Sequence, residues 1–266
     1  MFFISTVIII LVVFLAFLLI YMGKEAFSNR ILHHNLSFYE FPKSFDKVTI
    51  FFISDIHRRK ISDLIISKVT GKADIVVIGG DLTEKGVPFQ RVKANILKLT
   101  KIAPVYFVWG NNDHEVDIQL LESILLKCGV KILANSAEKY ESQTGDFFHL
   151  LGVDDIAKNR ERLDLALDDA QDNGFRLLLS HNPEIIHKIH PEANIQLVLS
   201  GHTHGGQIRV FNYGPYEKGG IKQVGRTILF VSNGYGTTAL PLRLGAKSET
   251  HLITIKNNNN PRLGNN

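Results

Sequence analysis

The sequence predicts an α/β protein in which two β-sheets pack as a sandwich flanked by helices, preceded by one transmembrane helix. Three observations predict this architecture. The first 22 residues are almost entirely apolar. From Val48 onward, short β-branched or aromatic runs alternate with stretches of helical length, which is typical of folds with a largely parallel sheet. After Gly205, glycine-rich loops join the remaining strands without a clear helix, which indicates antiparallel pairing in a second sheet.

The N-terminal segment is long enough to cross a membrane. Before the first charged residue, Lys24, only Ser5 and Thr6 are polar. At a rise of about 1.5 Å per residue, about 20 apolar residues span the roughly 30 Å hydrocarbon core of a bilayer. No basic residue precedes the run and no A-x-A cleavage site follows it, so we predict a permanent anchor over residues 1–23 instead of a cleaved signal peptide.

The basic residues after the anchor, Lys24 and Arg30, predict a single-pass protein of the cell membrane with a cytoplasmic globular domain. An extracytoplasmic domain is the alternative, because long C-terminal domains can be translocated regardless of such charges. We expect a juxtamembrane linker over residues 24–47 and the globular domain over residues 48–256. The Asn-rich residues 257–266 are expected to form a disordered tail.

The composition of the chain excludes several classes of protein. A charged fraction of 21% and the presence of 17 Phe argue against a disordered or multispanning chain. Cys128 is the only cysteine, which excludes both an intramolecular disulfide framework and a thiolate-rich zinc site. The formal net charge is +4, but no basic stripe is interleaved with aromatic residues, so nucleic acid is not an expected partner.

The body of the chain contains two kinds of expected element. Each expected strand is a short apolar run bounded by polar or glycine-containing turns; these strands cover residues 48–54, 75–78, 105–109, 130–133, 147–152, 176–179, 197–199, 227–231 and 250–255. The expected helices are amphipathic or polar stretches between those runs, at residues 62–70, 88–101, 118–127, 160–171 and 183–190.

Side chains that can bind a metal follow five of the strands. The carboxyl ends of neighbouring parallel strands face one crevice, so these side chains are expected to converge. A spacing of two residues in extended chain places both members of a pair on one side. Carboxylate, amide and imidazole donors suit Mn, Fe or Zn ions, and their number predicts a dinuclear centre with one bridging carboxylate. The candidate ligands are Asp55, His57, Asp81, Asn111, His181, His202 and His204.

This ordered set of motifs resembles the calcineurin-like metallophosphoesterase superfamily. The motifs are D-x-H from residue 55, G-D from residue 80, G-N-x-D from residue 110, His181, and G-H-x-H from residue 201. The sequence G-H-T-H-G-G-Q, with the later Ser232-Asn233-Gly234 and Pro241-Leu242-Arg243, is similar to a bacterial, often membrane-associated branch. The resemblance covers residues 48–255 and implies the two-sheet sandwich of that family.

The resemblance also implies a role for each candidate ligand. Two divalent ions would activate a bridging hydroxide for attack on phosphorus, with Mn²⁺ expected and Zn²⁺ or Fe²⁺ as alternatives. Asp81 would bridge the two ions. The first ion would be held by Asp55, His57, Asp81 and His204, and the second by Asp81, Asn111, His181 and His202.

One position departs from the family pattern. Asn112 stands where the family commonly has histidine, and an amide cannot act as a general acid near neutral pH. Asn112 can still donate a hydrogen bond to a phosphoryl group, so we predict Asn112 and Asp113 of the same motif as catalytic residues. His114 could replace the missing histidine in space. Phosphodiesters and pyrophosphates need less protonation of the leaving group than alkyl monoesters, and the substitution favours them as substrates.

Two basic residues, Arg58 and Arg59, directly follow the D-x-H motif. We predict that they bind a phosphorylated substrate or anionic lipid headgroups, with a solvated turn as the alternative.

Together these features predict a membrane-anchored, metal-dependent phosphoric ester hydrolase that cleaves a phosphoester or pyrophosphate bond. The predicted partner is a phosphorylated small molecule or a lipid-linked substrate, because the anchor holds the site beside the bilayer. The resemblance implies a nucleotide-linked lipid such as UDP-2,3-diacylglucosamine. Two alternatives stay open: a noncatalytic membrane-tethered metal-binding scaffold, which Asn112 supports, and a nuclease of the same superfamily, for which no nucleic-acid groove is evident.

Overall fold

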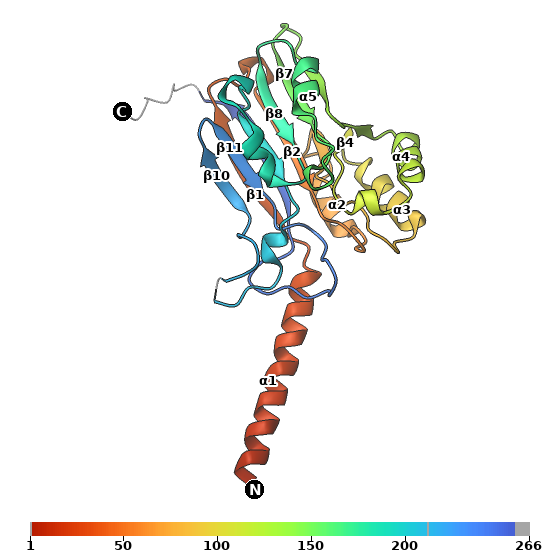
Figure 1. Cartoon of the computed structure of the whole chain (residues 1–266), viewed down its shortest axis with the longest axis vertical. Coiled ribbons are helices and arrows are strands. Elements are labelled where there is room, and N and C mark those ends of the chain that lie inside the picture. Colours follow the sequence, from red (N-terminus) through yellow and green to blue (C-terminus); the bar gives the residue numbers. More distant parts are fainter. Residues whose placement is uncertain (1, 212, 259–266) are drawn as a thin grey trace, which may run out of the picture.

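The computed structural model describes residues 2–211 and 213–258, which form two packed sheets and one projecting helix (Figure 1). The first sheet contains, in spatial order, β1 (Ile31–Phe38), β12 (Thr250–Asn257), β2 (Lys47–Ile53), β3 (Ile75–Ile78), β4 (Val105–Phe107) and β5 (Lys131–Ile132). The second contains β10 (Gly220–Val224), β11 (Thr227–Val231), β9 (Leu197–Ser200), β8 (Phe175–Leu179), β7 (Phe147–Gly152) and β6 (Ser136–Glu141). The α-helices are α1 (Phe2–Ala26), α2 (Asp63–Val69), α3 (Phe89–Leu99), α4 (Ile118–Lys127) and α5 (Leu163–Asp169).

The central strands of both sheets run parallel. Strands β2, β3, β4 and β5 pair in parallel, with Phe52 opposite Val77 and Ile78 opposite Phe107. Strands β7, β8, β9 and β11 do the same in the second sheet. These strands are short apolar runs because both of their faces are covered. Their carboxyl ends therefore deliver the following loops to one edge of the sandwich.

Three apolar clusters hold these layers together. The central cluster lies between the sheets and includes Phe52 and Val77 from the first sheet and Leu177 and Phe230 from the second. Helices α2, α3 and α4 cover the outer face of the first sheet, and α5 packs on the second. The predicted fold class, a two-sheet sandwich flanked by helices, is confirmed.

Helix α1 extends away from the sandwich, and only its last turns contact the body (Figure 1). Its length of 25 residues and its composition are sufficient to cross a membrane. Met22 and Ala26 are buried, and the Arg243 N–H donates to the Met22 carbonyl over 3.1 Å. The helix continues three residues beyond the predicted end of the anchor, so its last turn is part of the globular body.

The expectation of a linker over residues 24–47 is wrong, because this segment contains strand β1. Strand β1 pairs in parallel with β12, from Ile31 opposite Thr250 to Phe38 opposite Asn257. Leu36 and Phe38 alternate with more exposed residues and enter the core between the sheets. Only a few apolar residues of β1 are buried, but this edge strand still forms because β12 supplies its backbone hydrogen-bond partners. Residues 259–266 of the expected tail lie outside the described residues, while Asn257 closes β12.

Other elements also differ from the sequence expectations. Strands β6 and β10 are polar edge strands, so they lack the apolar pattern that predicts a strand. The expected helix at residues 183–190 is a 3₁₀ segment, Pro183–Lys188. Antiparallel pairing after Gly205 is found for β10 with β11, but β11 runs parallel to β9, and β12 belongs to the first sheet.

Candidate metal centre

The seven candidate ligands lie in the loops that follow β2, β3, β4, β8 and β9. Five of them have a left-handed backbone, which costs a non-glycine residue about 1–3 kcal/mol and is typical of functional sites. The prediction that extended chain aligns Asp55 with His57 is therefore wrong, because tight turns bring these side chains together. The five residues are Asp55 (φ 55°), His57 (50°), Asp81 (50°), His202 (72°) and His204 (49°).

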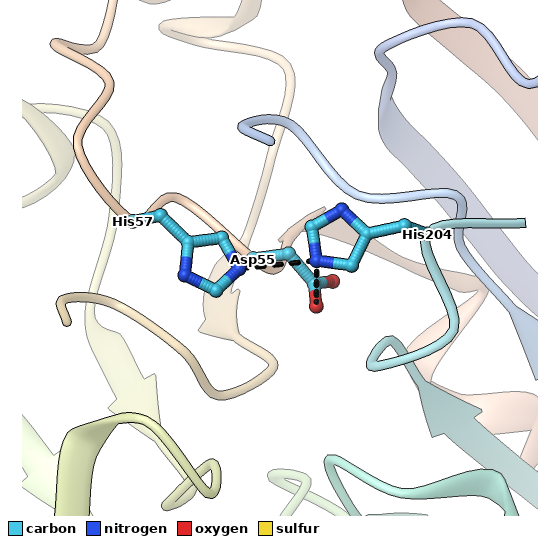
Figure 2. A group of neighbouring side chains, drawn as sticks. All are labelled: Asp55, His57 and His204. Atoms are coloured by element: carbon cyan, nitrogen blue, oxygen red, sulfur yellow. Dashed lines mark hydrogen bonds and ion pairs between the residues drawn. The ribbon is translucent and has the colours of Figure 1, made fainter. Parts of the chain in front are cut away.

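One group of candidate ligands consists of Asp55, His57 and His204, whose ligand atoms all lie within 4.8 Å of one another (Figure 2). The Nε2 atoms of His57 and His204 are 3.0 Å apart, and His204 Nε2 is 3.4 Å from Asp55 Oδ1. All three residues are buried. Two imidazoles and one carboxylate thus point at a common position.

A second group adjoins the first through Asp81. Asp81 Oδ2 lies 3.2 Å from His181 Nε2 and 3.7 Å from His57 Nε2, which places this carboxylate between the two groups. His202 Nδ1 lies 3.2 Å from His181 Nε2 and 3.0 Å from Asn111 Oδ1. The structure therefore brings all seven predicted ligands together. Asp55 belongs to both groups of converging ligand atoms, and Asp81 lies near both His57 and His181.

The donor set fits divalent cations. Asp55 Oδ2 is buried and has no hydrogen-bond partner among the described residues, although an unpaired buried carboxylate oxygen is costly. Pairs of imidazole nitrogens also face each other at 3.0 and 3.2 Å. These nitrogen and oxygen atoms carry lone pairs that point toward one another, which fits a cation bound between them.

Two glycines allow the ligand loops to approach one another. A Cβ atom at Gly110 would lie 2.3 Å from the Asp81 backbone nitrogen, and one at Gly201 would lie 2.4 Å from Asp55 Oδ2. Both distances are far below van der Waals contact. Any larger residue at Gly110 or Gly201 would displace a candidate ligand.

Groups behind the ligands fix the orientation of two histidine rings. Glu84 Oε2 lies 3.1 Å from His57 Nδ1, and the Gly79 carbonyl lies 2.9 Å from His181 Nδ1. With a cation bound, each contact would favour a proton on Nδ1 and leave Nε2 as the ligand atom. Sequence reasoning missed Glu84, because its role depends on a contact between two different loops.

Charges in the site set its protonation. Burial opposes a charge on His181, but the Asp81 carboxylate and its hydrogen bond outweigh burial and raise the pKa of His181 to about 10. Although burial alone would raise the pKa of Asp81, His181 and His57 hold it below its usual range. Burial and the positive neighbours His57 and Arg243 lower the pKa of His204 to about 3, so this ring stays neutral.

Metal loading is expected to release at least about one proton per chain at pH 7.5, because His181 is protonated below a pKa of about 10 and must lose that proton to bind a cation. Metal affinity should accordingly fall as the pH is lowered. The measurement is titration of the metal-free chain with Mn²⁺ by calorimetry in two buffers of different ionisation enthalpy. The matched control is His187→Gln, which changes an exposed ring, and it should release the same number of protons as the wild type. A heat that does not depend on the buffer would contradict this assignment.

Asn112 and Asp113 have different roles from each other. Asn112 lines the site, and its backbone N–H and Nδ2 donate to Asp81 over 2.9 and 2.7 Å. Asp113 is fully buried and accepts from the N–H groups of Thr83 and Gly110, both at 3.0 Å. Burial and the nearby Asp81 charge raise the pKa of Asp113 to about 7. The Asp113 side chain therefore holds two loops together, and a catalytic role for it stays a prediction.

His114 does not replace the missing histidine. Its Nε2 lies 2.7 Å from Asp154 Oδ1, and its ring stacks on Trp109 with centroids 5.1 Å apart. The side chain is thus held between Trp109, in the segment after β4, and Asp154, in the loop after β7.

Arg58 and Arg59 both contact other segments of the fold, and substrate binding by them stays a prediction. The Arg58 guanidinium is paired with Glu84, the residue that orients His57. Arg59 Nη2 donates to the carbonyls of Phe27 (2.7 Å) and Ser28 (2.9 Å), and Nη1 donates to that of Ala26 (3.2 Å). A cation at this position satisfies carbonyls that the end of a helix leaves free. Arg59 therefore connects the end of α1 to the D-x-H loop.

Arg243 is buried completely beside the site. Its Nη2 donates to the carbonyls of Asn233 and Gly236, both at 2.7 Å, and its Nη1 donates to that of Ala246 at 2.9 Å. Nη2 also lies 3.1 Å from His204 Nδ1. One guanidinium thus holds together the loops around His204. These contacts give a structural reason for the arginine of the Pro241-Leu242-Arg243 sequence.

A pocket of about 370 Å³ opens beside the candidate ligands. Its lining includes the polar residues Asp81, Asn111, Asn112 and His202. The lining also includes apolar or aromatic residues, namely Ile208, Pro215, Tyr216, Ala239 and Leu240. The pocket can therefore receive a ligand with a charged end and an apolar end.

The chain was compared with known proteins. The sequence profile of the calcineurin-like phosphoesterase family matches residues 48–206. The uncharacterized protein YpbG of Bacillus subtilis is 43% identical over 228 residues, which cover 84% of this chain and 88% of that protein. A transmembrane protein with metallophosphoesterase domain of Danio rerio is 30% identical and covers 81% of this chain and 54% of its own length. Phosphodiesterase YaeI of Escherichia coli is 28% identical over 244 residues, which cover 85% of this chain and 87% of that protein.

Proposed function

The chain belongs to the calcineurin-like phosphoesterase family and is a metal-dependent phosphoester hydrolase, and from this premise we propose that it cleaves a phosphodiester or pyrophosphate bond at a membrane surface. The observation that carries the proposal is the convergence of seven donor side chains on two adjoining positions at one edge of the sandwich. Proteins of this family use dinuclear metal centres. We infer that both ions are divalent and that Mn²⁺ is the native metal.

The candidate ligands divide into two sets. When bound, the ions would lower the pKa of a water molecule and neutralise charge on the phosphoryl oxygens. Asp81 supplies an oxygen to both sets and is fixed by two hydrogen bonds from Asn112. The first set is Asp55, His57, Asp81 and His204, and the second is Asp81, Asn111, His181 and His202.

The residues around the pocket limit the substrate to esters with good leaving groups. Asn112 holds the place where a general acid is commonly found in this family, and His114 is bound to Asp154. The departing oxygen must therefore leave with little help from a side-chain proton. A phosphate or an aryloxide leaves more readily than an alkoxide, which favours pyrophosphate-type substrates and diesters with an activated leaving group.

The anchor and the apolar residues of the pocket favour a lipid-linked substrate. Helix α1 would hold the domain at a bilayer, with the domain on the cytoplasmic side, because Lys24 and Arg30 follow the apolar run. The pocket is lined both by candidate ligands and by apolar residues such as Leu240. A nucleotide-linked lipid such as UDP-2,3-diacylglucosamine has both kinds of group.

The full-length chain in detergent micelles is expected to hydrolyse a bis-aryl phosphodiester when Mn²⁺ is added, and to lose this activity when a chelator is added. The rate should fall steeply as the pKa of the leaving group rises, since the site lacks a side-chain acid. A panel of aryl and alkyl esters, followed by release of the alcohol, measures both effects. Binding of about two ions per chain without turnover of any phosphoester would instead favour a noncatalytic scaffold.

A further inference from the structure

Five large apolar side chains gather on two neighbouring loops near the pocket. We call this set the interfacial patch; its exposed fractions are Val210 56%, Phe211 91%, Tyr213 84%, Tyr216 53% and Leu240 61%. Contiguous exposed apolar groups are uncommon on soluble proteins, and they mark contacts with partners or membranes. Leu64 and Leu126, which are also exposed, lie instead on helices α2 and α4.

The residues on either side of the Phe211 turn are paired through their backbones. Val210 and Tyr213 exchange two backbone hydrogen bonds of 3.0 and 2.9 Å, so Phe211 lies at the tip of a tight turn. Its φ of 48° lies in a region where a bulky residue is unfavourable and glycine is preferred. Because the Phe211 side chain is 91% exposed, packing against the described residues contributes little to its position.

The interfacial patch lies beside the end of α1. The Arg209 N–H donates to the Leu244 carbonyl over 2.8 Å, and the neighbouring Arg243 N–H donates to Met22 in the last turns of α1. Figure 1 shows the same arrangement, with the loops after β9 and β11 around the end of the projecting helix. The two loops and the helix end therefore share one face of the domain.

The length of α1 places the membrane boundary at this face. The apolar residues from Phe2 to Tyr21 span about 30 Å, which is the thickness of the hydrocarbon core. The bilayer interface therefore lies near Met22 and Lys24, level with the segment that Met22 contacts. Aromatic residues at this depth are typical of membrane proteins, because their rings are apolar and their hydroxyl groups remain hydrated.

We propose that the interfacial patch inserts into the headgroup region of the bilayer and directs the pocket toward membrane lipids. Tyr216 belongs both to the patch and to the pocket, and its ring centroid lies 6.4 Å from that of His202. Leu240 likewise lines the pocket. A lipid could then place its phosphoester at the candidate ligands while its acyl chain remains in the bilayer. This inference rests on the proposed anchoring by α1.

The test measures depth in the membrane and does not depend on catalysis. The full-length chain with Cys128→Ser and Phe211→Cys is labelled with an environment-sensitive fluorophore and reconstituted in phosphatidylcholine–phosphatidylglycerol vesicles. Vesicles with a nitroxide near the lipid headgroup are expected to quench this label at least about twofold more than a label at Leu126→Cys, a residue of α4 that is 58% exposed. Val210→Ser, Tyr213→Ser and Leu240→Ser together should reduce the quenching at position 211 to the level at position 126.

The outcomes separate this inference from the proposed function. If the chain fails to float with the vesicles, the proposed anchor is wrong. If it floats but the label at position 211 is quenched no more than the label at position 126, the inference alone is overturned. A blue-shifted label that the nitroxide lipid does not quench would also overturn it and would indicate contact with protein.

Discussion

Asp81→Asn is expected to lower phosphodiesterase activity at least about 10³-fold, equivalent to about 4 kcal/mol of transition-state stabilisation, without unfolding the protein. Asp81 is the carboxylate between the two groups of candidate ligands, within 3.2 Å of His181 and 3.7 Å of His57. A neutral amide would bind cations weakly at both positions, and it would place an NH₂ group where two acceptors are needed. Metal content should fall from about two ions per chain to fewer than one.

The matched control is Asp63→Asn, which changes an exposed carboxylate paired with Lys98. This variant should keep the activity and the metal content of the wild type. The measurements are kcat on a bis-aryl phosphodiester and elemental analysis of the purified chain. An Asp81→Asn enzyme with the full rate would refute both the assignment of Asp81 and the proposed mechanism.

The sequence predicts the central strands well because their pattern is local. Strand β3, with the run Ile75–Ile78, and strand β11, with Thr227–Val231, have the predicted bounds, and both are covered on two faces. Strands β1, β6 and β10 could not be found in this way. They lie at sheet edges, and a polar strand such as Ser136–Glu141 is formed through the backbone of its neighbour.

The ligands were predictable because their order along the chain is distinctive, but the geometry that joins them was not. Asp55 and His57 converge through left-handed turns, and these turns depend on contacts such as the hydrogen bonds from Ile56 and His57 to the Asp81 carbonyl. Glu84 and Arg59 act through partners in distant segments. A run of basic residues indicates a charged surface, whereas the fold uses Arg59 to bind the end of α1.

Arg243→Met is expected to lower the free energy of unfolding by about 4 kcal/mol and to reduce metal binding. Methionine fills a similar volume but donates no hydrogen bond, so the buried carbonyls of Asn233, Gly236 and Ala246 would each lose a donor. Burial lowers the pKa of Arg243 to about 10, which still leaves the guanidinium charged at neutral pH. Its removal would release the loops that hold His204 in place.

Urea titration in detergent micelles, followed by the fluorescence of the single buried Trp109, measures the loss of stability. The matched control is Arg162→Met at an exposed pair with Asp164, which should change stability by less than about 0.5 kcal/mol. Arg243→Lys keeps the charge with fewer donors, so it should lose less stability than Arg243→Met. If Arg243→Met were as stable as Arg162→Met, the guanidinium would not be what holds these loops. If the loops released by Arg243→Met are what position His204, metal content should fall in parallel with stability across the two Arg243 variants.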